Sequence, residues 1–179
     1  AQGGADRVYG WYHPMCLNSP YRDIVRGQLI ELARDYAVEG LWLDITYIFP
    51  ERCYCPFCRR LFRERTGREM PEQPAKGSAA LAEVMAFRRW TRLDYLTDLT
   101  GAVRAFRGPD FPFTWNHAGC PDFAQVEPDR LSTLSAGEFH APHYDEGFFK
   151  ADWMRGFGKP YELMMPECLY GWGEWTVAP

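Results

Sequence analysis

The most informative stretch of this sequence for fold and function is residues 39–62, EGLWLDITYIFPERCYCPFCRRLF. The apolar run 41–46 is typical of a short strand that is buried on both faces. Asp44 lies inside that run, where burial normally excludes a carboxylate unless it is paired or functional. Three cysteines then follow in C-x-C-x₂-C spacing: Cys53, Cys55 and Cys58. The stretch therefore indicates two chemistries, a carboxylate at the end of a strand and a cluster of thiols beside it.

Strand and helix patterns alternate along the chain on both sides of this stretch. The expected strands are residues 7–13, 41–46, 111–117, 131–140 and 160–167. The expected helices are residues 20–38, 56–67, 79–106 and 145–157, and the Pro- and Gly-rich residues 68–78 are expected to form a loop or insertion. Alternation of this kind, without Asn-Gly or Asp-Gly hairpin signals, predicts an α/β fold with a parallel sheet and helices packed on it.

Composition and charge exclude several classes of protein. The chain has 179 residues, 46% of them hydrophobic and 25% charged, which is typical of one globular domain. The net charge of −4 gives no basic surface for nucleic acid, and no apolar run approaches the roughly 20 residues of a membrane helix. Several arginines are interleaved with glutamates and are expected on a solvated helix face: Arg59, Arg60, Arg63, Arg65 and Arg68.

Four of the expected strands end in a polar residue. These residues are His13, Asp44, Asn116 and Glu138, with His140 two positions after the last. In parallel α/β folds the carboxyl ends of the strands lie at one edge, and ligands bind there. The pattern therefore predicts a single shared site.

Two carboxylates that face one pocket are the basic apparatus for hydrolysing a glycosidic bond. Asp44 is the candidate nucleophile and Glu138 the candidate acid/base. A structural alternative is open for both, because Asp44 could cap the following loop and Glu138 could pair with an arginine or His140. Glu167 and Glu174 compete for the acid role.

Aromatic residues make up 16% of the chain, and their flat faces suit sugars as well as cores. The candidate substrate-binding residues are His13, Trp42, Tyr47, Asn116, His117, His140 and Trp172. A lone histidine is more often a structural hydrogen-bond donor than a catalyst. A Gly-rich phosphate loop, a G-x-S-x-G elbow and an H-E-x-x-H motif are all absent, which disfavours nucleotide chemistry and serine or zinc proteolysis.

The cysteines allow three interpretations. Three thiolates with Cys16, Cys120 or a histidine could hold a tetrahedral zinc ion, although only residues 55–58 form the usual C-x₂-C knuckle. Alternatively the cysteines form disulfides, or they are buried and inert. A structural zinc or an unbonded cluster is favoured over a redox role, and no cofactor is expected for catalysis. Cysteine usage suggests a reducing, cytoplasmic compartment, while secretion stays open because the sequence begins without Met and is expected to be a fragment.

Four segments together resemble a known family. They are GLWLDITY (residues 40–47), CYCPFCRRLFRERTGREMP (53–71), CLNSPYRD (16–23) and GEFH (137–140). They resemble bacterial glycoside hydrolases of the α-L-fucosidase-like (β/α)₈-barrel group, some of which carry a β-galactosidase-type trimerisation domain. The likeness extends from Tyr9 to about Trp175 and is most specific over residues 40–71.

The resemblance implies a retaining glycosidase with an aspartate nucleophile at the end of the fourth barrel strand, which falls on Asp44. On that basis residues 1–179 are the central portion of one TIM-barrel catalytic domain, roughly strands three to seven, and residues 50–78 are a cysteine-containing loop and insertion. The expected substrate carries a terminal α-L-fucoside or β-galactoside, and the full-length parent could be a homo-oligomer. The alternatives are a non-catalytic carbohydrate-binding relative and a zinc-stabilised interaction module.

Overall fold

The computed structural model describes residues 15–44, 46, 53–116, 126–138 and 144–164. The chain divides into two compact units, the first made of Ala1–Tyr36 with Tyr47–Phe106 and the second of Ala37–Thr46 with Arg107–Pro179. The strand expected at residues 7–13 lies outside the described residues.

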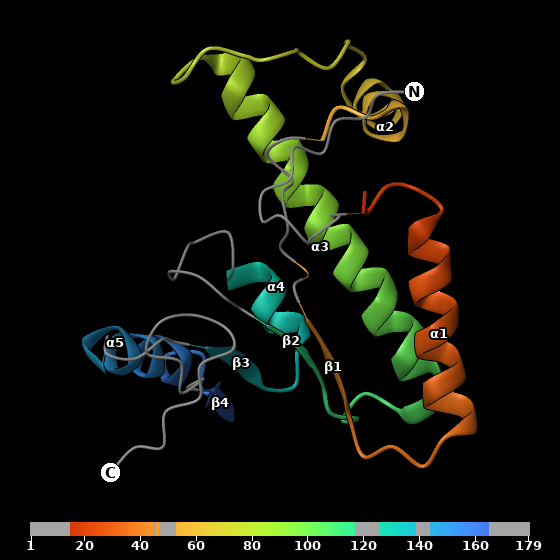
Figure 1. Ribbon diagram of the computed structural model, residues 1–179, viewed down its shortest axis with the longest axis vertical. Coiled ribbons are helices and arrows are strands. Elements are labelled where there is room, and N and C mark those ends of the chain that lie inside the picture. Colours follow the sequence, from red (N-terminus) through yellow and green to blue (C-terminus); the bar gives the residue numbers. More distant parts are fainter. Residues whose placement is uncertain (1–14, 45, 47–52, 117–125, 139–143, 165–179) are drawn as a thin grey trace, which may run out of the picture. The chain divides into compact units, whose positions relative to one another are not determined.

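The first unit is helical in its described part (Figure 1). Helix α1 spans Tyr21–Asp35, α2 spans Pro56–Thr66, and α3 begins at Ala79 and runs to Arg107. The predicted entry into α1 is confirmed, because the helix follows Pro20 directly. The predicted stop of α2 is also confirmed: Gly67 has a φ of 69° and its N–H donates to the carbonyl of Arg63. Only glycine adopts that left-handed conformation at little cost.

The core of the first unit is apolar and aromatic. Its buried members are Cys58, Phe62, Met70, Val84 and Phe87. The Phe62 and Phe87 rings meet edge to face with their centroids 5.2 Å apart, an arrangement that adds to the stabilisation from burial alone.

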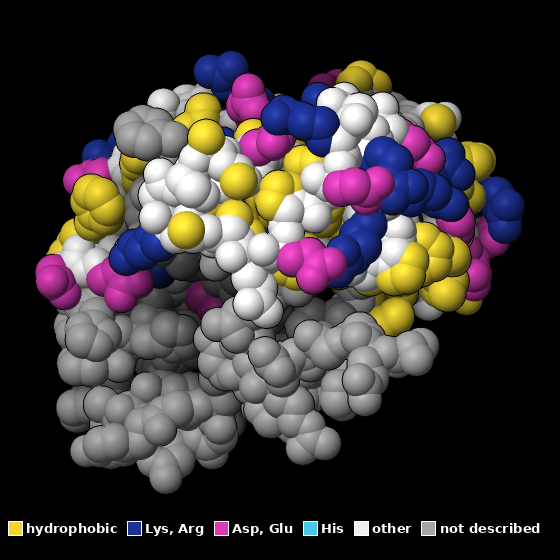
Figure 2. Space-filling view, turned by 90° about the horizontal axis from the view of Figure 1, so that it is seen from above, with side chains coloured by type: hydrophobic (Ala, Val, Ile, Leu, Met, Phe, Trp, Pro, Cys, Tyr) yellow, Lys and Arg dark blue, Asp and Glu magenta, His cyan; other side chains and the backbone are white. Residues whose placement is uncertain are grey.

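The arginine-rich face of α2 is solvated, as predicted. Arg63 pairs with Glu69 at 2.6 Å and Arg60 with Glu64 at 3.6 Å, and all four side chains are exposed. Basic and acidic side chains lie beside one another on the face shown in Figure 2. Exposed pairs of this kind add little to stability.

The second unit holds all four described strands. Strands β1 (Leu41–Leu43) and β2 (Phe113–Trp115) are paired in parallel, and so are β3 (Ser135–Glu138) and β4 (Tyr161–Met164). A parallel bridge between Asn116 and Ala136 joins the two pairs. Helices α4 (Val126–Leu131) and α5 (Tyr144–Arg155) connect the later strands. The predicted α/β alternation with parallel strands is confirmed.

A close approach of two segments fixes the start of β1. The amide of Leu41 donates to the carbonyl of Pro112 at 2.8 Å. A Cβ atom at Gly40 would lie 2.9 Å from the Pro112 Cβ and 3.0 Å from its carbonyl oxygen. Glycine is required at position 40 because any side chain would push β1 away from β2.

Two details of the predicted strands are wrong. Residues 126–131 form α4, so β3 begins only at Ser135. Strand β1 is not buried on both faces, because the Trp42 side chain is 42% exposed between two half-buried leucines. Among the described residues, no helix is both long and apolar enough to cross a membrane.

Candidate functional site

Asp44 and Asn116 lie side by side at the carboxyl ends of β1 and β2. The backbone N–H of Asn116 donates to the carbonyl of Leu43 at 2.8 Å, which continues the β1–β2 pairing by one residue. The Asn116 Nδ2 atom donates to Asp44 Oδ1 at 3.1 Å. Asn116 is only 2% exposed, whereas Asp44 is exposed. A buried amide therefore orients an accessible carboxylate.

Glu138 projects from the same face of the sheet. Residues paired in a parallel register point to the same face, and so do residues two apart on one strand. Asn116 is paired with Ala136, and Glu138 is two residues beyond Ala136. Glu138 therefore lies on the same face as Asp44 and is two residues nearer to the carboxyl end of the sheet.

The two faces of the β1–β2 pair differ in character. The face that carries Asp44 and Asn116 also carries the exposed Trp42, because it is two residues before Asp44. The opposite face of β2 carries Phe113 and Trp115, which are fully buried. The polar face is thus the one that could receive a ligand, and the apolar face belongs to the core.

The backbone of Glu138 is fixed by helix α5. Lys150 Nζ donates to the Glu138 carbonyl at 2.7 Å and pairs with the Glu146 carboxylate at 2.6 Å. The Glu138 side chain is half-buried and follows Gly137. Within the described residues its carboxylate pairs with no arginine.

The prediction that Asp44 is buried is wrong, because Asp44 is exposed. Among the described residues of the second unit, the buried carboxylate is that of Asp129, which is 2% exposed. The Ser135 hydroxyl donates to both of its oxygens, at 2.9 and 3.1 Å, and Lys159 Nζ lies 2.9 Å from its Oδ2. A carboxylate of α4 that is satisfied in this way by the first residue of β3 and by Lys159 is structural. No motif in the sequence distinguished it.

Several predicted site residues lie outside the described part of the chain. They are His13, Tyr47, His117, His140 and Trp172, together with the competing acids Glu167 and Glu174 and the candidate ligand Cys120. Their roles stay predictions.

Four cysteine thiols meet in the first unit. Cys53, Cys55 and Cys58 are joined by Cys16, and all four sulfur atoms lie within 4.8 Å of one another. The closest S–S distances are 3.4 Å from Cys16 to Cys58, 3.4 Å from Cys16 to Cys55 and 3.6 Å from Cys53 to Cys58. A disulfide is about 2.05 Å long, so these four cysteines are free. Their arrangement could bind a metal ion such as zinc.

Local structure places each thiol. Cys55 is the N-cap residue of α2, Pro56 begins the helix, and Cys58 follows in its first turn. Cys16 lies in a tight turn, where its carbonyl accepts the Ser19 amide at 3.0 Å. The positive end of a helix favours a thiolate, and so does a neighbouring cation.

The thiols change one another's acidity. Hydrogen bonds from Cys16 and Cys58 lower the pKa of Cys53. The hydrogen bonds with Cys53 and Cys58, together with burial, raise the pKa of Cys16. A metal ion would replace the shared protons and let all four sulfurs carry negative charge.

Positive charge surrounds the segment that carries three of the cysteines. The buried guanidinium of Arg88 lies 5.1 Å from the centre of the Tyr54 ring. Arg59 Nε donates to the Tyr54 carbonyl at 2.7 Å. Four thiolates around a divalent ion have a net charge of −2, and these guanidinium groups are suited to balance part of it.

The chain is similar to a solved structure over most of its length. Alpha-L-fucosidase isoenzyme 2 from Paenibacillus thiaminolyticus superposes with a TM-score of 0.71 over 91% of the chain, at 24% sequence identity. The chain spans 23% of that enzyme's length. No protein-family model matches the chain, and no curated protein sequence does. The likeness supports a fucosidase-like glycoside hydrolase fold for this part of the protein.

Proposed function

We propose that the protein containing this chain is a retaining glycoside hydrolase and that the chain is a central part of its (β/α)₈ barrel. The observation that carries the proposal is the placement of Asp44, Asn116 and Glu138 on one face of the sheet, at the carboxyl ends of parallel strands. Active sites of barrel enzymes lie at that end. The structural likeness to a fucosidase supports the same class of reaction.

In the proposed reaction, an Asp44 carboxylate oxygen attacks the anomeric carbon while Glu138 gives its proton to the leaving glycosidic oxygen. The bond from sugar to leaving group breaks as the bond to Asp44 forms. Water then attacks the same carbon, Glu138 takes its proton back, and Asp44 leaves as a free carboxylate. The Asn116 amide holds one Asp44 oxygen and leaves the other available.

The strand register supports this pairing of residues. Asp44 follows β1 and Glu138 ends β3, which lies two strands away in the sheet. Glu138 is also two residues further along the strand direction, and together these offsets correspond to a Cα–Cα separation of about 12 Å. Both side chains project from one face of the sheet, and the proposal requires their carboxyl groups to come within the ~5–5.5 Å that is typical of retaining enzymes.

The expected substrate is a terminal sugar, an α-L-fucoside or a β-galactoside. Trp42 offers an exposed aromatic surface on the face that carries Asp44. The apolar side of a sugar ring stacks on such a surface. Trp42 is therefore the described residue best placed to hold the sugar beside the nucleophile.

Replacing the nucleophile tests the proposal in the intact protein. Asp44→Asn should lower kcat/KM on a nitrophenyl glycoside by about 10³-fold or more, because the covalent step is lost. Asp44→Gly should regain turnover with azide and release a glycosyl azide of inverted configuration. Asp110→Asn, an exposed change in the same unit, is the matched control.

Two results would contradict the proposal in different ways. Normal turnover by Asp44→Asn would remove the nucleophile assignment alone. A wild-type protein that binds sugars but cleaves no member of a glycoside panel would favour the non-catalytic relative.

We also infer that the four cysteines hold a structural zinc ion. Tetrahedral zinc with Zn–S bonds of about 2.3 Å places its sulfur ligands roughly 3.8 Å apart, and the measured contacts of 3.4 to 3.6 Å are close to that value. Four thiolate ligands leave no open position, so the ion would brace the fold without taking part in hydrolysis. Elemental analysis should find one zinc ion per chain, and less in Cys58→Ser. Zinc-free, fully folded wild-type protein would contradict this inference.

A further inference from the structure

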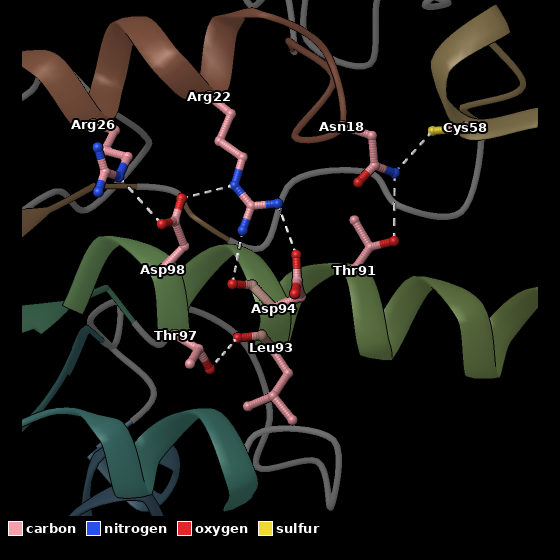
Figure 3. A network of polar contacts seen from close by, with 9 residues as sticks. All are labelled: Asn18, Arg22, Arg26, Cys58, Thr91, Leu93, Asp94, Thr97 and Asp98. Carbon is pink, nitrogen blue, oxygen red and sulfur yellow. Dashed lines mark hydrogen bonds and ion pairs between the residues drawn. The ribbon is translucent and has the colours of Figure 1, made fainter. Parts of the chain in front are cut away.

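Asn18 contacts the cysteine cluster without being part of it. Its Nδ2 atom donates to Cys58 Sγ at 3.3 Å and to Thr91 Oγ1 at 3.4 Å. Figure 3 shows the amide between the sulfur and the α3 hydroxyl. One side-chain amide therefore joins a candidate zinc ligand to the middle of a helix that begins at Ala79.

The chemistry of this contact matches a metal-bound sulfur. A thiolate on zinc has no proton to donate, so it can only accept, and the NH₂ group must face it. Cys58 is also the most buried of the four cysteines, at 5% exposed. Water is thus poorly placed to solvate that sulfur, and the Asn18 N–H provides a hydrogen bond in its place.

Asn18 is the end of a row of polar contacts along α3. Arg22 donates to Asp94 at 2.7 Å and to Asp98 at 3.0 Å, and Arg26 donates to Asp98 at 3.2 Å. Arg22 and Arg26 are four residues apart on α1, and the acceptors on α3 are three or four apart, so each of these sets lies on one helix face, with Asn18 in the turn before α1 (Figure 3). The row ties α1 and the turn that carries Cys16 to α3.

We propose that Asn18 is a positioning residue of the zinc centre: its amide orients Cys58 toward the ion and fastens the centre to α3 through Thr91. This inference rests on the proposed zinc site. Hydrogen bonds from outside the ligand set commonly change metal affinity by about 10- to 100-fold. Asn18 therefore sets how long the ion stays bound.

The test compares zinc release from variants of the intact protein to a chromophoric chelator. Asn18→Asp keeps the shape, removes the N–H and places a carboxylate against Cys58, so release should be about 10-fold faster or more. Asn18→Ala should release faster by a smaller factor. Thr91→Val keeps the bond to sulfur and should have the smallest effect of the three. Gln28→Glu makes the same amide-to-acid change at an exposed position of α1 and should leave release unchanged.

A spectroscopic readout separates this role from loss of packing. With cobalt(II) in place of zinc, the thiolate-to-metal charge-transfer band should move to lower energy in Asn18→Ala, because a sulfur that loses an N–H donor gives up its electrons more easily. Thr91→Val should leave the band in place. Reduced packing alone would speed release and leave the band unchanged.

The outcomes distinguish the inference from the site on which it rests. Wild-type protein that binds neither zinc nor cobalt would overturn the metal centre and the role of Asn18 together. Metal-bound wild type, with Asn18→Asp and Asn18→Ala showing the same release rate and the same band, would overturn the role of Asn18 alone.

Discussion

The two units differ in how far their candidate functional groups are buried. In the first unit the candidate metal ligands are half-buried or buried and turn toward one another, and Asn18 adds a further donor from the same unit. In the described part of the second unit the candidate nucleophile Asp44 is exposed, and the carboxylate that is buried, Asp129, is structural. A buried cluster that satisfies itself suits a structural ion, whereas a group that must meet a substrate has to stay accessible.

Removing the proposed zinc ion should show the largest difference between the units. Structural zinc contributes about 10 kcal/mol or more to the folding of small zinc peptides. Chelation should therefore sharply raise amide hydrogen exchange in residues 53–66, because the ion links that segment to Cys16. Exchange in β3 and α5 should change little. Equal increases in hydrogen exchange in both units would show that the cysteines do not stabilise the first unit alone.

Lys159→Met should give the next largest effect, and in the second unit. It removes the Lys159 cation from the buried Asp129 carboxylate, and breaking a buried ion pair typically costs about 3–5 kcal/mol of unfolding free energy. Denaturant unfolding measures the loss. Lys76→Met, an exposed change in the loop before α3, is the control and should stay within about 0.5 kcal/mol of wild type. A loss below 1 kcal/mol for Lys159→Met would show that Asp129 does not depend on this cation.

Asn116→Ala should have the smallest of these effects, and mainly on turnover. A hydrogen bond to a charged group is worth about 1.5–3 kcal/mol, so kcat should fall by about 10- to 100-fold as Asp44 loses its fixed orientation. KM should change little. Gln28→Ala, an exposed amide on α1, serves as the control. A variant with unchanged kcat would show that the Asn116 contact does not position the nucleophile.

Local signals in the sequence predicted the elements well. Apolar periodicity located α3, and Gly67 marked the end of α2. Both signals depend on neighbours within one or two turns, which is why they can be recognised without coordinates. The boundaries of β3 were predicted less well, because residues 126–131 fold into α4 around contacts of Asp129 with residues that follow it.

The candidate sites were predicted only in part. The C-x-C-x₂-C spacing indicated three of the four clustered thiols, but the choice of Cys16 as the fourth depends on a contact across 42 residues to Cys58. No sequence motif indicated the contact of Asn18 with Cys58 either. The strand-end pattern indicated that Asp44, Asn116 and Glu138 would share an edge, and the parallel register places them on one face.

Local sequence patterns are enough to predict the α/β alternation, the parallel direction of the strands and the residues that follow their ends. These properties arise from short-range preferences and from chain direction. Which carboxylate is exposed and which is buried, and which distant thiol joins the cluster, depend on the folded chain. Burial and long-range contact depend on segments that are far apart in the chain, and no local sequence pattern predicts which of these segments will be in contact.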